Sequence, residues 1–456
     1  MEVRDAVHVL ADHVANVRYE DLSEAALAAS KTFILDTFGV AIAGTTGPFV
    51  EEMIEAARGW GDDTTSTVLG SDILLPAPSA ALINAYQAHN SEFDAIHERA
   101  VIHPLASILG AALSIAERDG GISGRDLLVA ATVGVDVSCS IGMGATEALR
   151  FFRPATAGSF GAVAALGKLA GFDRDRLIAA LGLQLGQIGG TMQAHEEGSP
   201  LLGMQLGFCT RSAVTSFDLA SQGLSGPRGV LEGRHGYYAL FEGGYDVSTA
   251  LEGLGQDWRI CGVSHKPFPS GRATHGAIDG LLQLREAHDI EAPMVEHVRV
   301  EVPPLVHQLT GRPMIDDPGV NYARLCIPYV GAVALAQGNV ELEDFQSDRL
   351  CDLDMRKLAG RFAVDIRDVG DPNALVPQRV SVRLTDGREV ATDLSNVIGS
   401  PANPLSRERH LTKFRGNWVS GRTPLDPETG EQLITMVDVL ETVDDCRALT
   451  ATMVAD

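Results

Sequence analysis

The sequence contains few lysines and carries a large excess of negative charge. Its 456 residues include 36 basic and 60 acidic ones, which gives a formal net charge of −24. The lysines are Lys31, Lys168, Lys266, Lys357 and Lys413. Such a charge repels nucleic acid and anionic membrane surfaces, so neither is an expected partner. An anionic ligand would need a local pocket of positive charge within this acidic protein.

Cysteine is also sparse, and no two cysteines form a Cys-x-x-Cys pair. The six are Cys139, Cys209, Cys261, Cys326, Cys351 and Cys446. Their spacing predicts buried free thiols in a reducing compartment and excludes a zinc or iron–sulfur site of paired cysteines. The N-terminal segment lacks the apolar core of a signal peptide, and no run of eighteen apolar residues occurs. We therefore expect a cytoplasmic protein without a membrane span.

Helical periodicity, in contrast, is abundant. A chain of this length exceeds what one hydrophobic core usually holds, so two domains are expected. Up to about residue 260, apolar residues recur at helical spacing, for example over 21–43, where Asp21 and Glu24 resemble a capping box. Many alanines and glycines in these segments indicate closely packed helices. The first domain is predicted to be a helical bundle.

The pattern changes after about residue 265. Residues 296–304 alternate charged and apolar side chains, as a strand does, and residues 378–394 form two such runs around Asp386-Gly387, which predicts a hairpin. The segments expected to be helices between them are 322–338 and 347–362. This mixture predicts an α+β second domain, and the tail that follows is helical again.

The stretch from Tyr86 to Ser107 concentrates groups that can exchange protons. Its ionisable side chains include His89, Glu92, Asp94, His97, Glu98, Arg99 and His103. Because Pro104 suits the first position of a helix, His103 is predicted to be the N-cap, where the helix dipole favours a neutral imidazole and a neighbouring anion. Carboxylates and imidazoles at one helix end can do acid–base chemistry on a carboxylate substrate. The alternative is a solvated, charged loop between two core helices.

Five segments of the chain form an ordered set of motifs. They are HNSEFDAIHERAVIHP at 89–104, GSFGAVAALGKLAGF at 158–172, GLSGPRGVLEGRHGYY at 223–238, HKPFPSGRATHGAIDG at 265–280 and NPLSRERHLTKF at 403–414. Together they resemble the MmgE/PrpD family, which includes 2-methylcitrate dehydratases, cis-aconitate decarboxylase and an iminodisuccinate epimerase. The resemblance extends over almost the whole chain.

The resemblance implies a mainly α fold, with a large all-helical domain built from both chain ends and a smaller α+β lid inserted before the tail. In this sequence the helical domain would comprise residues 1–262 and 400–456, and the lid residues 263–399. The active site would lie between the two domains. Members of the family usually form homodimers through the helical domain, so a homodimer is expected here.

The resemblance also implies catalytic residues. The family's essential histidine before proline falls on His103, and its acidic stretch falls on Glu92 and Asp94. His103 would be a general base or acid, with Asp94 or Glu92 orienting it or sharing its proton. The family's motif lysine falls on Lys266, and a family tyrosine falls on Tyr329, which could protonate a leaving hydroxyl.

Candidate substrate-binding residues are Arg153, Lys266, Arg272 and His275, the last of which matches the terminal histidine of the family's lysine motif. Lys266 and Arg272 could hold carboxylates from the lid, since arginine can bind a carboxylate bidentately. Each has a structural alternative. Arg153 and Arg272 could form interdomain salt bridges, while His275, like Tyr329, could be a core residue.

Three positions depart from the family pattern. A histidine that relatives often have before proline is Arg153 here, and the loop SPLLGMQL before Gly207 has no lysine. Gly271 stands where the decarboxylase has a histidine. These differences favour another acid or another reaction over decarboxylation.

The expected function is that of a cofactor-independent lyase or isomerase acting on a small di- or tricarboxylate. Dehydration, as in a 2-methylcitrate dehydratase, is the leading reaction, and epimerisation or decarboxylation of a related acid are the alternatives. A catalytically silent relative that binds an organic acid or serves as an assembly partner is an alternative of another class. No metal-ligand spacing occurs in the sequence, so no metal is expected.

Overall fold

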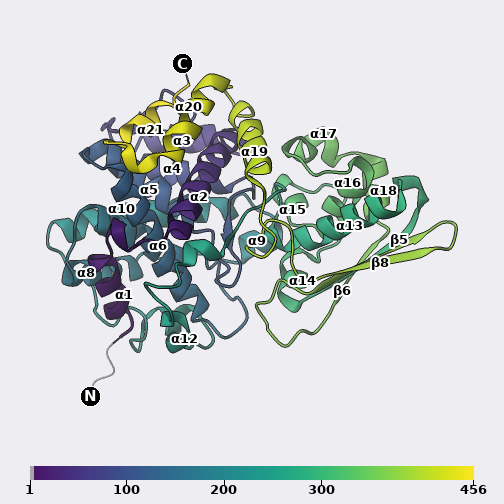
Figure 1. Ribbon diagram of the computed structural model, residues 1–456, viewed down its shortest axis with the longest axis horizontal. Helices are drawn as coiled ribbons and strands as arrows, with labels where there is room; N and C mark the ends of the chain where they lie inside the picture. Colours follow the sequence, from purple (N-terminus) through teal and green to yellow (C-terminus); the bar gives the residue numbers. More distant parts are fainter. Residues whose placement is uncertain (1–4, 456) are drawn as a thin grey trace.

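The computed structural model describes residues 5–455, and Figure 1 shows a mass of helices beside a smaller part that contains a sheet. This confirms the mainly α class with an α+β portion. The predicted ranges 1–262 and 400–456 include residues 1–4 and 456, which lie outside the described residues.

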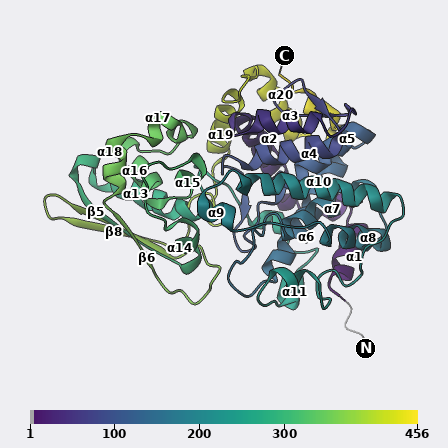
Figure 2. The same ribbon diagram turned by 180° about the vertical axis from the view of Figure 1, so that it is seen from behind.

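The helical part contains both ends of the described chain. Its helices are α1 (Val7–Asn16), α2 (Glu24–Ala43), α3 (Val50–Arg58), α4 (Ala77–His89), α5 (Pro104–Asp119), α6 (Gly124–Met143), α7 (Ala157–Leu169), α8 (Arg174–Leu185), α9 (Gln193–Glu197), α10 (Leu201–Ser221), α11 (Tyr237–Phe241), α12 (Val247–Leu251), α19 (Arg407–Val419), α20 (Pro427–Asp438) and α21 (Arg447–Ala451). Tail residues such as Phe414, Trp418 and Leu433 are buried in the same hydrophobic core as the N-terminal helices. Figure 2 shows α19 and α20 against α2 and α3 from the other side.

Glycines allow the central helices to approach closely, as the small-residue segments predicted. A Cβ added at Gly134 on α6 would lie 2.8 Å from the carbonyl oxygen of Gly161 on α7. A Cβ added at Gly161 would lie 2.5 Å from the oxygen of Gly134. Both distances are shorter than van der Waals contact, so only glycine permits this helix pair at this separation.

Two helices are long and apolar enough to cross a membrane by length and composition, although no strictly apolar run of eighteen residues occurs. They are α2 and α6, and 67% and 89% of their most apolar windows are buried inside the protein. Core helices of a folded domain pass the same test. Here their apolar side chains pack against other helices in the hydrophobic core.

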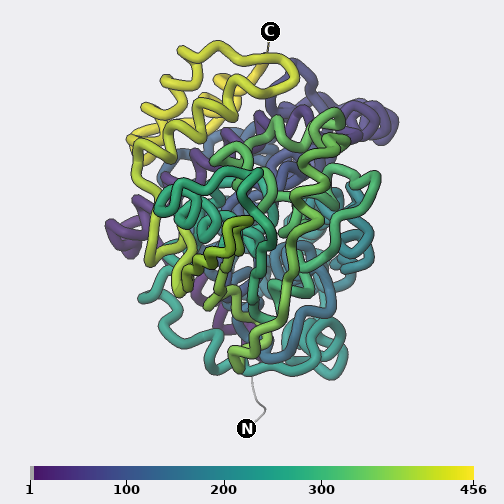
Figure 3. Tube along the Cα trace, turned by 90° about the vertical axis from the view of Figure 1, so that its right-hand side faces the viewer, coloured from purple at the N-terminus to yellow at the C-terminus, as the bar shows by residue number. Residues whose placement is uncertain are grey.

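The lid is a four-stranded sheet covered by helices. Its strands are β5 (Val295–Val302), β6 (Phe362–Ile366), β7 (Gln378–Leu384) and β8 (Glu389–Leu394), in the order β6-β5-β7-β8. Its helices are α13 (His275–His288), α14 (Pro304–Thr310), α15 (Val320–Arg324), α16 (Ile327–Gln337), α17 (Ser347–Leu350) and α18 (Leu353–Ala359). The predicted β5 strand and the β7–β8 hairpin are present, with Gly387 at φ 90° in the turn. Figure 3 shows the lid in front of the helical part.

The structure differs from the sequence expectations at four places. The helix expected over 322–338 is interrupted at Leu325 and Cys326, between α15 and α16. The helix expected over 347–362 ends at Ala359, and Phe362 begins β6, which pairs in parallel with β5. The N-cap of α2 is Ser23, whose side chain accepts a hydrogen bond from the backbone of Ala26, in place of the expected Asp21–Glu24 box. All six cysteines are free thiols, but Cys261 and Cys351 are exposed instead of buried.

Candidate active site

The candidate active site is organised by the loop between α4 and α5. Glu92 (φ 52°) and Val101 (φ 54°) both adopt the left-handed backbone conformation, which is costly for residues other than glycine and frequent at functional sites. His103 is the N-cap of α5 and Pro104 its first residue, as predicted, but the imidazole makes no capping hydrogen bond. Its Nδ1 lies instead 3.2 Å from Asp94 Oδ2.

A short ladder brings the start of the lid to this loop. Strand β3 (Ile96–His97) pairs antiparallel with β4 (Val263–Ser264), and Lys266 follows two residues after β4. The fully buried Lys266 Nζ donates hydrogen bonds to Glu92 Oε2 at 2.8 Å and to the Glu92 carbonyl oxygen at 3.1 Å. The same nitrogen lies 3.9 Å from Asp94 Oδ1. The structure therefore unites Glu92, Asp94, Lys266 and His103.

A second imidazole, which the sequence analysis left without a role, joins the cluster. His89 Nδ1 lies 3.1 and 3.0 Å from the two carboxylate oxygens of Asp94, and the His89 and His103 ring centroids are 4.7 Å apart. Asp94 thus stands between two histidines. Because His103 Nδ1 lies beside the Asp94 carboxylate, the tautomer with its hydrogen on Nδ1 is favoured, which leaves the lone pair of Nε2 available to accept a proton.

Burial and neighbouring charges shift the pKa values of His89 and His103 in opposite directions. Burial, helped by the charge of Lys266, lowers the pKa of His103 despite the proximity of Asp94. Burial also opposes protonation of His89, but the charge and hydrogen bond of Asp94, with Glu92, raise the pKa of His89 overall. Burial would raise the pKa of Glu92, but Lys266 and both histidines lower it to about 2. At neutral pH the cluster holds a neutral His103 beside an ionised Asp94.

We expect the two ring titrations to lie on opposite sides of the ordinary histidine value near 6.5. The contribution of protonated His89 to stability is present below this value and is lost as the pH rises through its raised folded pKa. Nitrogen-15 NMR of the imidazoles, with His89→Gln to assign the signals, should show His103 neutral at pH 6.5 while His89 retains its proton. Because the two rings titrate as one coupled pair, the quantity to compare is the order in which they take up protons. Protonation of His103 before His89 on acidification would contradict this arrangement.

A partly enclosed cavity adjoins the cluster. Its empty volume is about 570 Å³, including space open to solvent, and Glu92 and His103 lie in its wall together with Arg272 and Thr310 from the lid. Most of the other lining side chains are apolar and come from both parts of the chain. This is the place where a ligand can touch His103.

Arg272 lies in the cavity wall, but its charge is already paired. Its Nε and Nη2 both lie 2.8 Å from Glu98 Oε1, and Nη1 donates to the Ile398 carbonyl oxygen at 2.7 Å. His275, predicted to bind substrate, lies behind it, fully buried, with Nδ1 3.3 Å from Arg272 Nη1. These contacts connect the two points at which the chain enters and leaves the lid.

Two other predicted site residues point elsewhere. Arg153 Nε and Nη2 lie 3.0 and 3.1 Å from the two carboxylate oxygens of Glu242, which also accepts a hydrogen bond from Tyr237. The Tyr329 hydroxyl donates to the Asp344 carbonyl oxygen within the lid core. Among the described residues, neither Arg153 nor Tyr329 lines the cavity.

His195 is a cavity residue that sequence reasoning missed. Its Nδ1 lies 3.1 Å from Arg312 Nη2, and burial together with the charge of Arg312 lowers its pKa to about 4. Because arginine can only donate, Nδ1 accepts and Nε2 carries the hydrogen. His195 therefore offers a neutral donor. These two residues are 117 positions apart, so no local sequence signal connects them.

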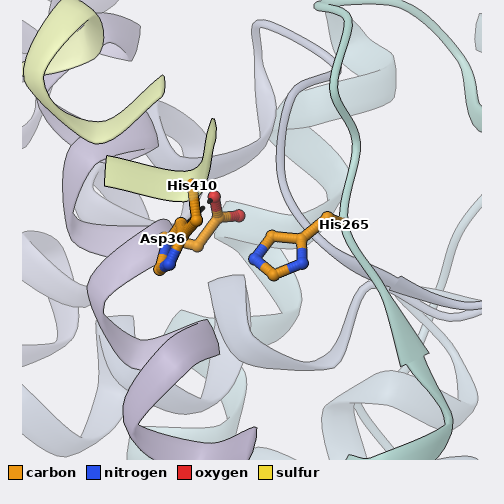
Figure 4. Close-up of side chains that lie close together, drawn as sticks. All are labelled: Asp36, His265 and His410. Carbon is orange, nitrogen blue, oxygen red and sulfur yellow. Dashed lines mark ion pairs between the residues drawn. The ribbon is translucent and has the colours of Figure 1, made fainter. Parts of the chain in front are cut away.

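Two groups of three side chains could geometrically hold a metal ion within the part of the chain that the structure describes. They are His89, Asp94 and His103, and Asp36, His265 and His410, with candidate ligand atoms within 4.8 Å of one another. Figure 4 shows the second group, drawn from three separate segments. In each group a lysine lies beside the carboxylate, Lys266 at 3.9 Å from Asp94 and Lys413 at 2.8 Å from Asp36. These ammonium groups supply positive charge where a metal would.

Comparison with known proteins identifies the family of the chain. The chain matches the MmgE/PrpD N-terminal domain over residues 8–250 and the MmgE/PrpD C-terminal domain over residues 268–442. The cis-aconitate decarboxylases of Mus musculus and Homo sapiens are each 26% identical to it, covering 99% of this chain and 93% and 95% of theirs. That of Aspergillus terreus is 25% identical over 88% of this chain and 86% of its own. The two domain matches span most of the sequence, and the chain belongs to the MmgE/PrpD family.

Proposed function

We propose that this protein is a cofactor-independent lyase that dehydrates a small hydroxy acid with two or three carboxylates. The observation that carries the proposal is His103, a buried imidazole of lowered pKa that borders the cavity and is held by Asp94. Such a ring is a competent general base at neutral pH. Proton removal next to a carboxylate is the difficult step that this base would serve.

The reaction can be assigned to the residues that border the cavity. His103 takes the proton from the carbon next to a carboxylate, the electrons of that C–H bond form the double bond, and the C–O bond to the β-hydroxyl breaks. The imidazolium of His103 returns the proton to the departing oxygen, which leaves as water. Asp94 stabilises the transient imidazolium. The His195 N–H in the cavity wall would donate to the developing negative charge, and the paired Arg272 guanidinium adds a fixed positive charge in the same wall. Because the Tyr329 hydroxyl is engaged inside the lid, proton return is assigned to His103.

Decarboxylation is the second candidate, favoured by the names of the relatives. Two cavity positions speak against decarboxylation. Gly271 lies in the wall, and a Cβ there would lie 2.6 Å from Leu325 Cδ2, so this leucine takes the room that a basic side chain would need. Leu202, from the segment that lacks a lysine, lies in the first turn of α10 instead of the expected loop and is also in the wall. Epimerisation would share the proton abstraction and differ in the second step.

Turnover of citrate, 2-methylcitrate and cis-aconitate tests the proposal. We expect a hydroxy acid to yield a conjugated unsaturated acid, detected by ultraviolet absorbance, with no release of carbon dioxide. Carbon dioxide release from cis-aconitate would establish decarboxylation instead. Inversion of a stereocentre without a new double bond would identify an epimerase, and saturable binding without any turnover would identify a silent acid-binding protein.

Chelation should leave the activity intact. Lys266 and Lys413 already neutralise the carboxylates of the two candidate metal groups, so a divalent cation would have to displace a buried ammonium. We expect kcat to change less than about twofold after dialysis against EDTA, measured against a sample restored with zinc or magnesium. Loss of activity with EDTA and recovery with one metal would contradict cofactor independence.

A further inference from the structure

The cavity beside His103 has a long apolar wall. Leu149, Phe152, Met192 and Leu202 from the helical part face Leu309 and Leu375 from the lid. Leu149, Met192, Leu309 and Leu375 also belong to one hydrophobic cluster with Val101 and Leu305. The cavity is therefore mostly apolar, with its polar groups gathered at one end. Such a site suits a ligand that has one polar and one apolar end.

Among the described residues, no cationic side chain in the cavity wall itself lacks a carboxylate partner; Arg312, which contacts His195, is engaged with that ring and with backbone carbonyl oxygens. In the described residues the charged side chains that line the cavity are Glu92 and Arg272, whose charges cancel. Arg272 is paired with Glu98, and Lys266, just behind the wall, is paired with Glu92. A ligand with three carboxylates would place at least one of them against leucine and methionine, and an unpaired buried carboxylate is strongly disfavoured.

We propose that the substrate carries an alkyl arm of several carbons, with its carboxylates gathered at the His103 end of the cavity. This inference rests on the proposed function, because it places the reacting carbon at His103, and it narrows that function to an alkyl-substituted dicarboxylate. The His195 N–H is the donor for the acid end, and the Arg272 guanidinium, whose own N–H groups are engaged by Glu98 and backbone carbonyls, adds only its positive charge there. Leu149, Phe152, Met192, Leu202, Leu309 and Leu375 bury the arm.

Calorimetric binding of unreactive acids tests the alkyl arm without turnover. The probes are succinate, 2-methylsuccinate, 2-butylsuccinate and tricarballylate, none of which has a hydroxyl to lose. Burial of each methylene is expected to tighten binding about two- to fourfold, so 2-butylsuccinate should bind at least about eightfold tighter than 2-methylsuccinate. It should also bind tighter than tricarballylate. Equal affinity along the alkyl series, or tighter binding of tricarballylate, would overturn the inference.

Neighbouring leucines provide a matched pair of variants. Leu202 is buried in the wall, whereas Leu201 beside it is 37% exposed and does not line the cavity. Leu202→Lys should weaken 2-butylsuccinate binding at least about tenfold and strengthen tricarballylate binding, while Leu201→Lys should change both less than about twofold. If Leu202→Lys does not fold by circular dichroism, the half-buried Leu309→Ala replaces it. In that variant, the ratio of the affinity for 2-butylsuccinate to that for 2-methylsuccinate should fall at least about threefold. An unchanged ratio would overturn the inference.

The outcomes separate this inference from the proposed reaction. Length-dependent binding with no turnover of any hydroxy acid would sink the proposed lyase and leave the apolar arm supported. Turnover of citrate together with binding that does not depend on alkyl length would support the proposed lyase and overturn the inference of an alkyl arm.

Discussion

Replacement of His103 by alanine is expected to lower kcat about 10²- to 10⁴-fold, the usual contribution of a general base. The imidazole is held by Asp94 at 3.2 Å and its pKa is lowered by burial, so it is neutral and able to accept a proton at pH 7. It makes no capping hydrogen bond, and Pro104 begins the helix without it. The helix should therefore form normally in the variant, and KM should change far less than kcat.

The control for His103→Ala is His97→Ala. His97 is also a buried histidine of the same loop, with its pKa lowered to about 4, chiefly by burial, but it does not line the cavity. Circular dichroism and steady-state kinetics on both variants separate a folding defect from a catalytic one. Near-normal kcat in folded His103→Ala would show that this ring has no catalytic role, and proton transfer would belong to another group.

Replacement of Lys266 by methionine is expected to destabilise the protein by about 3–5 kcal/mol at pH 7, because it leaves a buried carboxylate without its partner. Glu92, with its pKa near 2, is ionised in the folded protein. A depressed folded pKa means that the ion pair contributes fully above the ordinary value near 4.5 and loses its contribution as the pH falls toward 2. The stability difference between variant and wild type should therefore narrow over this range in urea denaturation.

The double variant Glu92→Gln/Lys266→Met separates stability from function. Removing both charges and retaining volume should restore most of the stability. We expect KM to return close to the wild-type value as well, because removing Glu92 and Lys266 together leaves the net charge beside the cavity unchanged. Recovered stability with KM still raised at least about tenfold would contradict this and assign Lys266 a direct role in substrate binding.

Features that depend on neighbours along the chain could be predicted from the sequence. Pro104 identified His103 as an N-cap, and Asp386-Gly387 identified the hairpin, because a helix start and a tight turn each require particular backbone angles locally. Strand β6 was missed because it is a short edge strand directly after α18, with little alternation in its burial. Its pairing with β5 is parallel and cannot be inferred from adjacency.

Side-chain partners far apart in the sequence could not be predicted. Arg153 was expected at the substrate, but it pairs with Glu242, 89 residues away, and no pattern in the chain marks that choice. Lys266 was brought to Glu92 across 174 residues by the β3–β4 ladder, two residues long on each strand. The family motifs indicated that such residues matter, whereas the direction of each side chain depended on packing.

The central claim is that His103 removes a proton next to a carboxylate and that water, not carbon dioxide, leaves. Proton NMR in D₂O, with the hydroxy acid that the wild type turns over fastest, tests it most directly. We predict loss of the Cα proton and formation of a conjugated C=C bond, detected by ultraviolet absorbance, with every carboxylate retained by carbon-13 NMR, and a rate about 10²- to 10⁴-fold lower for His103→Ala. A product that has lost a carboxylate, or an equal rate in the variant, would contradict the claim.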